Sequence, residues 1–377
     1  MGSLSIRGLT ARYGRTVALH GIDLEIADGE FFVILGPSGA GKTTTLKSVA
    51  GLVDQVEGEV RIAGRDMTGV EPYDRGVAMA FESYALYPQK TVEENLASPL
   101  RSGRNGTWTR AQQSERIRQV TRTLGIDHLL ARYPRELSNG QRQRTALGRV
   151  LVRPAHVYLL DEPLSHLDAK LRAAMRAELK QLGELSRTTT LYVTHDYQEA
   201  LALGDRVGVL REGRLVQVGT PAQVWAEPAD TFVARALGQP ETNLLDAVAD
   251  AGVARTVGGA LVVGVGPEVA GAVRLGIRPR DLEIVDDAAP GDRLVLRGRV
   301  ALAERLGRSV ELSVDVAGSG GTDRLIAVTS DHRVHEGDAV TLGVAWERIH
   351  VFGAPDETAP RLGAATRPAA VLTEGAR

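Results

Sequence analysis

Two short apolar runs in the first half of the chain predict buried strands. Residues 31–35 and 157–160 are apolar or aromatic at every position and rich in β-forming side chains, which is typical of strands covered on both faces. The first run is followed by a glycine-rich stretch at 36–41 and then by helically spaced residues at 42–51. The pattern therefore predicts a strand, a tight loop and a helix in direct succession.

Strands and helices alternate through the rest of this half. The spacing of apolar residues is mainly helical over 91–152; it predicts a helix over 168–185, a strand over 189–193 and another helix starting from Asp196. Such alternation favours an α/β fold, in which helices cover the faces of a parallel sheet. The long helical stretch, placed at about 88–155, is expected to form a subdomain inserted into that fold.

From about residue 237 the pattern changes to short strands separated by Gly, Pro and Asp turns, which predicts a small all-β barrel or sandwich. We therefore expect a first domain at 1–236 and a β-domain at 237–354. Residues 355–377 show no periodicity and are expected to form a flexible tail. The strands expected in the β-domain are 260–266, 272–277, 293–303, 309–316, 324–329 and 339–345.

Composition excludes several functional classes. The chain has no cysteine, so disulfides, thiolate metal sites and cysteine nucleophiles are ruled out. Its formal net charge is only -2, which gives no overall attraction to nucleic acid or anionic lipid. No apolar run approaches the roughly 20 residues that span a bilayer, and the first residues lack the apolar core of a signal peptide. We therefore expect any membrane role to come through partner chains, and no nucleic acid partner.

The glycine-rich loop matches the phosphate-binding pattern G-x-x-x-x-G-K-[ST]. Glycines let the backbone approach a phosphate closely, so that successive N–H groups can point at it. Lys42 supplies charge to the β- and γ-phosphates, Thr43 offers a hydroxyl to Mg²⁺, and the following helix adds its N-terminal dipole. ATP and Mg²⁺ are thus the expected cofactors; a chance match is the alternative, which the strand–loop–helix context disfavours. The binding candidates are Gly36, Pro37, Ser38, Gly39, Ala40, Gly41, Lys42, Thr43 and Thr44.

An acidic pair, Asp161 and Glu162, ends the second apolar run. Carboxylates at the end of a buried strand need a partner, because burying an unpaired charge is unfavourable. Asp161 is placed to hold Mg²⁺, and Glu162 to polarise an attacking water. A solvated acidic turn would explain an isolated pair, but this pair accompanies a phosphate-binding loop.

Between these motifs lies the segment Leu137-Ser-Asn-Gly-Gln141, and here the chain resembles the ATP-binding subunits of ABC transporters, whose signature is L-S-G-G-Q. The resemblance covers residues 3 to about 240. It implies that Tyr13 stacks on adenine and that His195 touches the γ-phosphate, so that Lys42, Glu162 and His195 are the catalytic candidates. Taken alone, Tyr13 could be a packed aromatic and His195 a structural residue at a helix start. The resemblance adds these nucleotide-binding candidates: Tyr13, Ser138, Asn139, Gly140, Gln141 and Asp168.

The second half resembles a narrower group within that family. Residues 232–243, 276–282 and 346–352 are similar to the connector and the appended OB-like β-barrel in the ATPases of maltose-type and glycerol-phosphate-type importers. This implies a regulatory β-barrel and transport of a carbohydrate, polyol or related solute. It also implies two membrane-spanning permease subunits, a second ATPase chain and, indirectly, an extracytoplasmic solute-binding protein. The resemblance places the chain peripherally on the cytoplasmic side of the membrane, with the loop at 81–88 against the permeases.

Two residues depart from the family pattern. Glu82 stands where the family has a glutamine that ligates Mg²⁺; a carboxylate can still be a ligand, so we expect Thr43, Glu82 and Asp161 to hold the metal. Asn139 stands where the signature has its first glycine. Because asparagine is the non-glycine residue that best tolerates positive φ, we expect the signature loop to persist.

Three functions remain open from the sequence. The first is the ATPase subunit of a solute importer. The second is an ABC protein that remodels nucleic acid or ribosomes, but such chains usually carry two ATPase halves or long basic insertions, which are missing here. The third is an ATP-binding regulatory partner of a second, more active ATPase in a heterodimer. Glu82 and Asn139 favour this third function, whereas the intact Glu162 and His195 favour the first.

Overall fold

In the computed structural model the chain divides into two units, Met1–Val224 and Trp225–Arg377. The structure describes residues 2–53, 55–81, 86–101, 107–165, 168–186, 188–285, 293–354, 356 and 358–368. The division precedes the boundary expected at 236/237, and it falls within α7 (Pro221–Ala226). Among the described residues, no helix is both long and apolar enough to cross a membrane.

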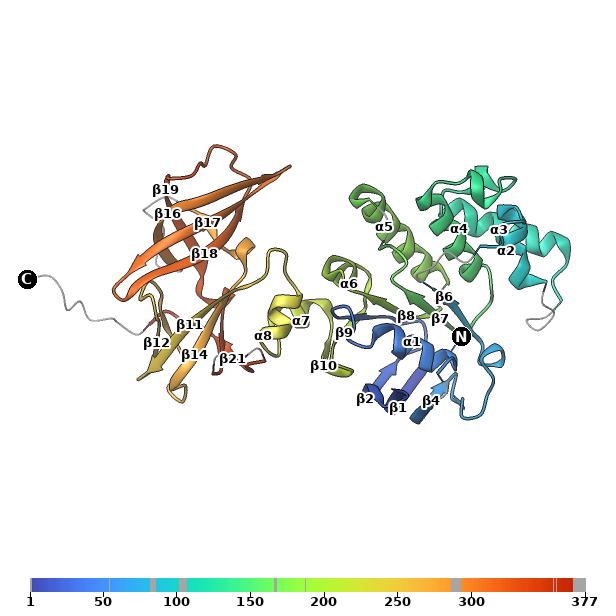
Figure 1. Cartoon of the computed structure of the whole chain (residues 1–377), viewed down its shortest axis with the longest axis horizontal. Coiled ribbons are helices and arrows are strands. Elements are labelled where there is room, and N and C mark those ends of the chain that lie inside the picture. Colours follow the sequence, from blue (N-terminus) through green and yellow to red (C-terminus); the bar gives the residue numbers. More distant parts are fainter. Residues whose placement is uncertain are drawn as a thin grey trace, which may run out of the picture. The chain divides into compact units, whose positions relative to one another are not determined.

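A six-stranded sheet forms the centre of the first unit, in the order β10-β9-β3-β8-β7-β6 (Figure 1). All neighbouring strands are parallel except β10, which runs antiparallel to β9. Every residue of β3, β7 and β8 is buried, which confirms the strands expected from the two apolar runs and from 189–193. The strands are β3 (Phe31–Leu35), β6 (Val77–Ala80), β7 (Val157–Asp161), β8 (Thr189–Thr194), β9 (Arg206–Arg211) and β10 (Arg214–Gly219).

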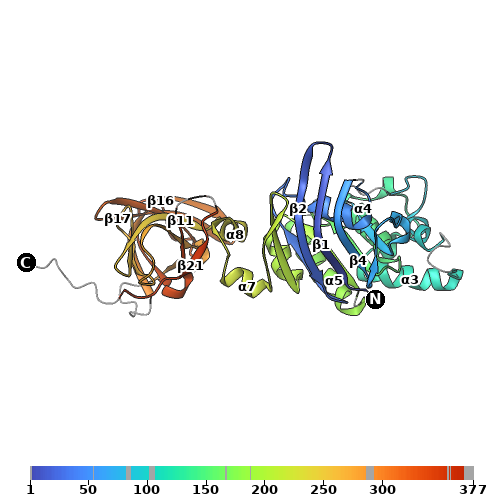
Figure 2. The same ribbon diagram turned by 90° about the horizontal axis from the view of Figure 1, so that it is seen from below.

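A second, antiparallel sheet completes this unit, and Figure 2 shows three of its strands, β2, β1 and β4, side by side. Helix α1 (Lys42–Ala50) shares one apolar core with both sheets, to which it contributes Leu46 and Val49. The helix that follows the phosphate-binding loop is therefore held from two sides. The strands of this sheet are β1 (Leu4–Tyr13), β2 (Thr16–Ile26), β4 (Gln55–Ile62) and β5 (Arg65–Asp66).

The helical stretch of the first unit contains α2 (Val92–Ala97), α3 (Arg110–Thr123) and α4 (Asn139–Leu151), which pack on one another. Each begins at a capping box, in which a Thr or Ser hydroxyl and a Glu or Gln three residues later satisfy free backbone N–H groups. Two further helices, α5 (Ala169–Ser186) and α6 (Tyr197–Leu203), contact each other, and α6 packs on β3 and β8. These helices confirm the α/β class expected from the alternating pattern.

The second unit is almost entirely β, as its strand pattern predicted. Its two antiparallel sheets are ordered β13-β12-β11-β14-β20-β21 and β15-β19-β16-β17-β18, and they curve around a common apolar core in an OB-like arrangement (Figure 2). Helix α8 (Thr231–Ala236) precedes the strands. The strands are β11 (Asn243–Asp250), β12 (Val253–Thr256), β13 (Val262–Gly264), β14 (Gly271–Ile277), β15 (Glu283–Ile284), β16 (Arg293–Leu306), β17 (Ser309–Gly318), β18 (Gly321–Thr329), β19 (Ala339–Ala345), β20 (Ile349–Phe352) and β21 (Arg361–Ala364).

The prediction of a flexible tail over 355–377 is wrong for its first part. Residues Arg361–Ala364 form β21, which pairs antiparallel with β20 at His350 and Val351. A strand at a sheet edge is held by backbone hydrogen bonds, so it can form without the alternating side-chain pattern on which the prediction relied.

A buried arginine fastens the start of the second unit to its β-sheet. Arg278 is 2% exposed; its guanidinium lies 4.2 Å from the ring centre of Trp225 and donates to the Trp225 carbonyl and to Nε2 of His350 at 3.1 Å. His350 must therefore be neutral at Nε2. Burial, reinforced by the Arg278 charge, lowers the pKa of His350 to about 3.

This arrangement predicts a pH-dependent loss of stability. Unfolded histidine titrates near 6.5, so below that pH the unfolded chain binds a proton that folded His350 does not, and stability falls as pH falls toward about 3. Between pH 7 and pH 5 His350 alone should account for about 2 kcal/mol of the free energy of unfolding. His350→Gln keeps an acceptor for Arg278 and should remove this part of the pH dependence, as followed by tryptophan fluorescence in denaturant. His335→Gln, at an exposed histidine, is the control, and equal pH slopes in wild type and His350→Gln would contradict the assignment.

Candidate functional site

The site forms where three neighbouring parallel strands end at the same edge of the sheet. Strand β8 lies between β3 and β7, with Leu35 opposite Thr194 and Asp161 opposite Val193. The alignment continues past the strands, because the N–H of Gly36 donates to the carbonyl of Thr194 at 3.3 Å and that of Glu162 to Val193 at 3.1 Å. The loop after β3, the acidic pair after β7 and the histidine after β8 are thus brought together.

The loop at 36–41 is shaped by its glycines. A Cβ at Gly36 would lie 2.5 Å from the Leu210 carbonyl oxygen, and Gly41 has φ 105°, where a Cβ would meet Leu19 at 2.8 Å. Helix α1 begins directly after Gly41, without a side-chain cap and without an acidic residue in its first turn. Its first N–H groups and its positive dipole end are therefore available to an anion.

Lys42 is the cation of the loop, and it is 5% exposed. Its ammonium donates to the carbonyl oxygens of Gly36 at 2.9 Å and Pro37 at 3.0 Å, and lies 3.3 Å from Oε1 of Glu162. Helix α1 thus holds a buried positive charge between the loop backbone and a carboxylate. A nearly buried positive charge beside a helix N-terminus is suited to neutralise phosphate oxygens, which would replace these partners.

Thr43 and Asp161 offer the kind of oxygen atoms that Mg²⁺ prefers. The Thr43 hydroxyl donates to Oδ1 of Asp161 at 3.0 Å, and Asp161 is 4% exposed. Within the described part of the chain, no group of three or more His, Asp or Glu residues could hold a metal by itself. One hydroxyl and one carboxylate fit Mg²⁺, which binds through few protein ligands and completes its shell with water and phosphate oxygens. The third expected ligand, Glu82, lies outside the described residues.

The Glu162 carboxylate lies between the Lys42 ammonium and the His195 imidazole. Its Oε2 lies 2.7 Å from Nδ1 of His195, while Oε1 faces Lys42. Glu162 has φ 43°, a left-handed conformation that is unfavourable for a non-glycine residue by about 1–3 kcal/mol. Such strain persists only where the surrounding structure enforces it, here through the Glu162–Val193 backbone bond and the two side-chain partners. The arrangement can orient a water and accept its proton.

The signature segment caps a helix. The N–H of Gln141 donates to Oγ of Ser138 at 3.3 Å, and the Gln141 side chain accepts from the Ser138 N–H at 2.9 Å. Asn139 is the first residue of α4, and its side-chain oxygen accepts from Arg142. The signature segment thus keeps a regular capped helix start with asparagine in place of glycine, and the tolerance of asparagine for positive φ is not needed, because Asn139 is not among the residues with positive φ.

The remaining candidates lie on other elements. Tyr13 ends β1 with 49% of its surface exposed. Asp168 caps the first turn of α5 through the N–H of Leu171 at 2.9 Å. The structure thus brings together the five residues Lys42, Thr43, Asp161, Glu162 and His195, while Tyr13, the signature segment and Asp168 lie on separate elements of the same unit.

Two buried side chains near the site were missed by sequence reasoning. Gln143, on α4, donates to the carbonyl of Pro163 directly after the acidic pair, so the signature helix is bonded to the end of β7. Glu199, on α6, accepts hydrogen bonds from the hydroxyls of Tyr192 and Thr194, which lie in β8 before His195. Gln143 lies two residues after the signature and Glu199 four after His195, but only their burial in the fold distinguishes them from surface polar residues.

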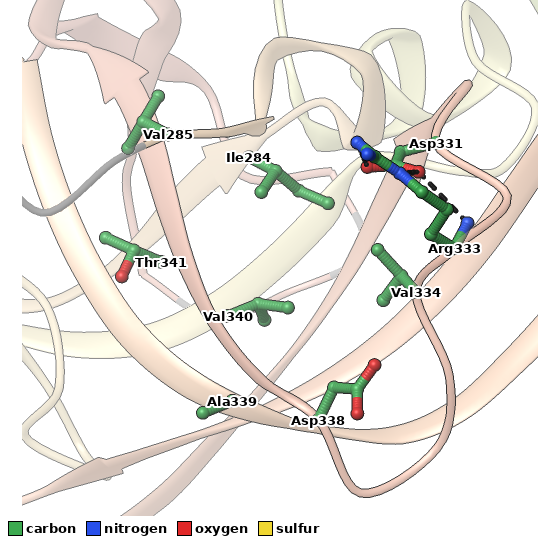
Figure 3. A pocket seen from close by; sticks show the side chains of 9 residues that line it. All are labelled: Ile284, Val285, Asp331, Arg333, Val334, Asp338, Ala339, Val340 and Thr341. Atoms are coloured by element: carbon green, nitrogen blue, oxygen red, sulfur yellow. Dashed lines mark hydrogen bonds and ion pairs between the residues drawn. The ribbon is translucent and has the colours of Figure 1, made fainter.

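A hollow of about 650 Å³ in the second unit has a different character (Figure 3). Apolar side chains such as Ile284, Val334 and Val340 line it together with acidic residues. The guanidinium of Arg333 is paired with both carboxylate oxygens of Asp331 at 2.9 Å. The described residues that line this hollow include no glycine-rich loop and no helix N-terminus, so the nucleotide site is assigned to the first unit, where the loop at 36–41 leads directly into α1.

Comparison with known proteins agrees with this geometry. Residues 19–165 match the ABC transporter family and residues 275–352 match the TOBE domain. The chain is 41% identical over 352 residues to the sn-glycerol-3-phosphate import ATP-binding protein UgpC of Ruegeria sp., covering 93% of this chain and 97% of the relative. It is 44% identical over 360 residues to the trehalose/maltose import ATP-binding protein MalK of Thermococcus litoralis, covering 90% and 94%.

Solved structures match the first unit. The dimeric structure of MJ0796, described as a bacterial ABC transporter cassette, is 29% identical with a TM-score of 0.53, and the match covers 58% of this chain and 98% of that one. A post-hydrolysis form of the same cassette with bound ADP and phosphate matches equally well. Identity of this extent over both units, together with a site that fits Mg²⁺ and ATP, shows that the chain belongs to the ATP-binding and ATP-hydrolysing subunits of the ABC transporters.

Proposed function

We propose that this chain powers the import of a carbohydrate, polyol or related small solute by binding and hydrolysing ATP on the cytoplasmic face of a membrane complex. The observation that carries the proposal is the identity across both units to import ATP-binding proteins. Those relatives are named for sn-glycerol-3-phosphate, trehalose/maltose and xylose/arabinose. The solute itself is chosen by other subunits, so the proposal extends only to this chemical class.

The residue roles follow from the contacts of the site. Lys42 and the N-terminal end of α1 bind the β- and γ-phosphates, and Thr43 and Asp161 hold Mg²⁺, which when bound neutralises phosphate charge. Glu162 positions the attacking water and accepts its proton, and His195 keeps Glu162 oriented. The supporting observation is that Glu162 has one oxygen 3.3 Å from the Lys42 ammonium and the other 2.7 Å from His195.

A second ATPase chain completes the site in this proposal. The residues of the phosphate-binding loop cover one side of the nucleotide, whereas Ser138–Gln141 and Asp168 lie on different elements that would close the site of a facing chain. Tyr13, exposed at the end of β1, would stack on the adenine. Support comes from the dimeric form of the solved cassettes. The chain would work with two permease subunits and, through them, with an extracytoplasmic solute-binding protein.

The contact with the permeases is assigned to residues 82–98. Tyr84 lies outside the described residues, but Tyr87 is 44% exposed, and its ring lies 4.5 Å from the Lys90 ammonium and 5.4 Å from the Arg149 guanidinium. Its N–H and carbonyl are both bonded to the buried Asn95 side chain. An exposed aromatic side chain in a loop that is bonded in this way to α2 is suited to an interface.

The alternative of an unequal pair of ATPases has lost part of its basis. It relied on Glu82 and Asn139 altering the two elements that report on the γ-phosphate. Asn139 occupies a regular helical position and the capping box around it is intact, so this residue does not distort the signature segment within its own chain. The effect of Glu82 stays a prediction, and two identical chains are the simpler assembly.

Two substitutions in the site should separate ATP hydrolysis from ATP binding. Glu162→Gln should lower kcat for ATP by about 10²–10⁴-fold while ATP binding is retained, so the variant should accumulate as an ATP-bound dimer. Lys42→Ala should instead weaken ATP binding by about tenfold or more, because a charge-assisted hydrogen bond is lost. The control is Lys47→Ala, which removes a lysine in the last turn of the same helix. Equilibrium binding and light scattering provide the readouts, and a Glu162→Gln chain that stays monomeric in Mg-ATP would contradict the sandwich.

The ATPase activity of the full complex tests the proposed class of solute. The full complex, reconstituted in vesicles with its permeases and binding protein, should hydrolyse ATP faster when a carbohydrate or polyol that the binding protein takes is present. Sugars, polyols and their phosphates should be compared with amino acids and inorganic anions. Stimulation by an amino acid, with none by any sugar or polyol, would overturn the proposed solute class and leave the ATPase assignment intact.

A further inference from the structure

A buried carboxylate lies directly behind the histidine of the site. Glu199, on α6, is 2% exposed, and its Oε2 accepts hydrogen bonds from the hydroxyls of Tyr192 at 2.7 Å and Thr194 at 2.8 Å. Burial raises the pKa of Glu199, and burial next to this carboxylate raises that of Tyr192 well above its usual range. A carboxylate buried at this depth is unfavourable unless its hydrogen bonds compensate, and this one takes no direct part in phosphate chemistry.

The residues on both sides of His195 are bonded to Glu199, Thr194 to its carboxylate and Asp196 to its backbone N–H. Thr194 donates to Glu199 and accepts from the N–H of Asp196 at 3.0 Å. Asp196 in turn caps α6 through the N–H groups of Gln198 and Glu199. His195 itself is exposed over half of its side chain, so its direction is set by the turn from 194 to 196 rather than by packing around the ring.

A second anchor comes from α5. Nη1 of Arg172 lies 3.1 Å from Oδ2 of Asp196, and its Nε lies 4.0 Å from Oε1 of Glu199. The N–H of Arg172 also donates to the carbonyl of Asp168 at 2.8 Å, in the first turn of α5. The loop that ends at Asp168 and the turn that carries His195 are therefore fixed to the same arginine.

We propose that Glu199 is a positioning residue for ATP hydrolysis, which together with Arg172 holds the turn at 194–196 so that His195 stays within hydrogen-bonding distance of Glu162. The inference rests on the proposed roles of His195 and Glu162. Because His195 lies 2.7 Å from Glu162, a displacement of the turn by about 1 Å is enough to break that contact, and misplacements of this size lower rates strongly.

The chemistry of the contact makes a matched pair of variants possible. Both hydroxyls donate to a single oxygen of Glu199, so the amide oxygen of Glu199→Gln can accept both, whereas Glu199→Ala accepts neither. Glu199→Ala should lower kcat at saturating Mg-ATP by about tenfold to a hundredfold with little change in KM, and Glu199→Gln should restore most of the rate. Gln198→Ala, at an exposed position of the same helix, should leave the rate unchanged.

A double-mutant cycle on the full-length chain distinguishes positioning from a general loss of structure. If Glu199 acts through His195, then Glu199→Ala should cost nothing further in a His195→Ala background, because the two substitutions remove one function. Rates are expressed per nucleotide-binding site, so that unfolded protein does not contribute. Additive losses, or a rate per site equal to that of wild type in Glu199→Ala, would overturn the inference.

A spectroscopic measurement makes the test independent of turnover. With ¹⁵N-labelled histidine, the ring signals of His195 are assigned from the spectrum of His195→Ala, and the tautomer reports its bond to Glu162. Glu199→Ala should shift these signals toward a solvated imidazole, and Glu199→Gln should not. If His195→Ala leaves kcat unchanged, the proposed role of His195 fails; if the His195 signals are unchanged in Glu199→Ala, the positioning role of Glu199 fails, whatever the rates.

Discussion

The position of β8 between β3 and β7 is the constraint on which the rest of the site depends. Parallel neighbours end at the same edge of a sheet, so the residues that follow these strands lie close together. The hydrogen bonds that Gly36 and Glu162 donate to the backbone at the end of β8 extend the register by one residue beyond the strands. A slip of β8 by one residue would turn its side chains to the opposite faces, and both Tyr192 and Thr194 would then leave Glu199.

Much of the first unit could be predicted from the sequence, because its chemistry is concentrated in short motifs next to strongly apolar strands. The sequence motifs alone indicate the loop to Lys42, the pair Asp161 and Glu162, and His195, and the structure brings these residues together. The left-handed conformation of Glu162 and the buried state of Glu199 could not be predicted. The first arises from contacts of Glu162 with β8, Lys42 and His195, and the second from contacts of Glu199 with β8 and Arg172. Long-range contacts of this kind leave no periodic signal in the chain.

The sequence pattern predicts less of the second unit than of the first. It indicates β14 and β16–β19 but not the eight-residue strand β11. It also predicts a loose tail where the edge strand β21 forms, since edge pairing depends on the backbone rather than on the side-chain pattern. The packing of the two sheets also depends on single polar residues. The buried Asn243 bonds to the backbone at both Ile277 and Ile326, one in each sheet. One asparagine near the start of β11 carries no signal of that role in the sequence.

The bonds of Lys42 to its own loop have a consequence for nucleotide exchange. Its ammonium is already satisfied by two backbone carbonyls and a carboxylate, so a phosphate does not gain a free cation but displaces existing partners. The net gain is then the difference between two sets of contacts, and it grows with the negative charge of the incoming group. In the proposed role of Lys42, the loop would therefore favour the nucleotide that carries more negative charge on its phosphates. If Lys42 binds the nucleotide as proposed, the carbonyls of Gly36 and Pro37 compete for its ammonium again once the terminal phosphate has left, and this competition would favour release of the product.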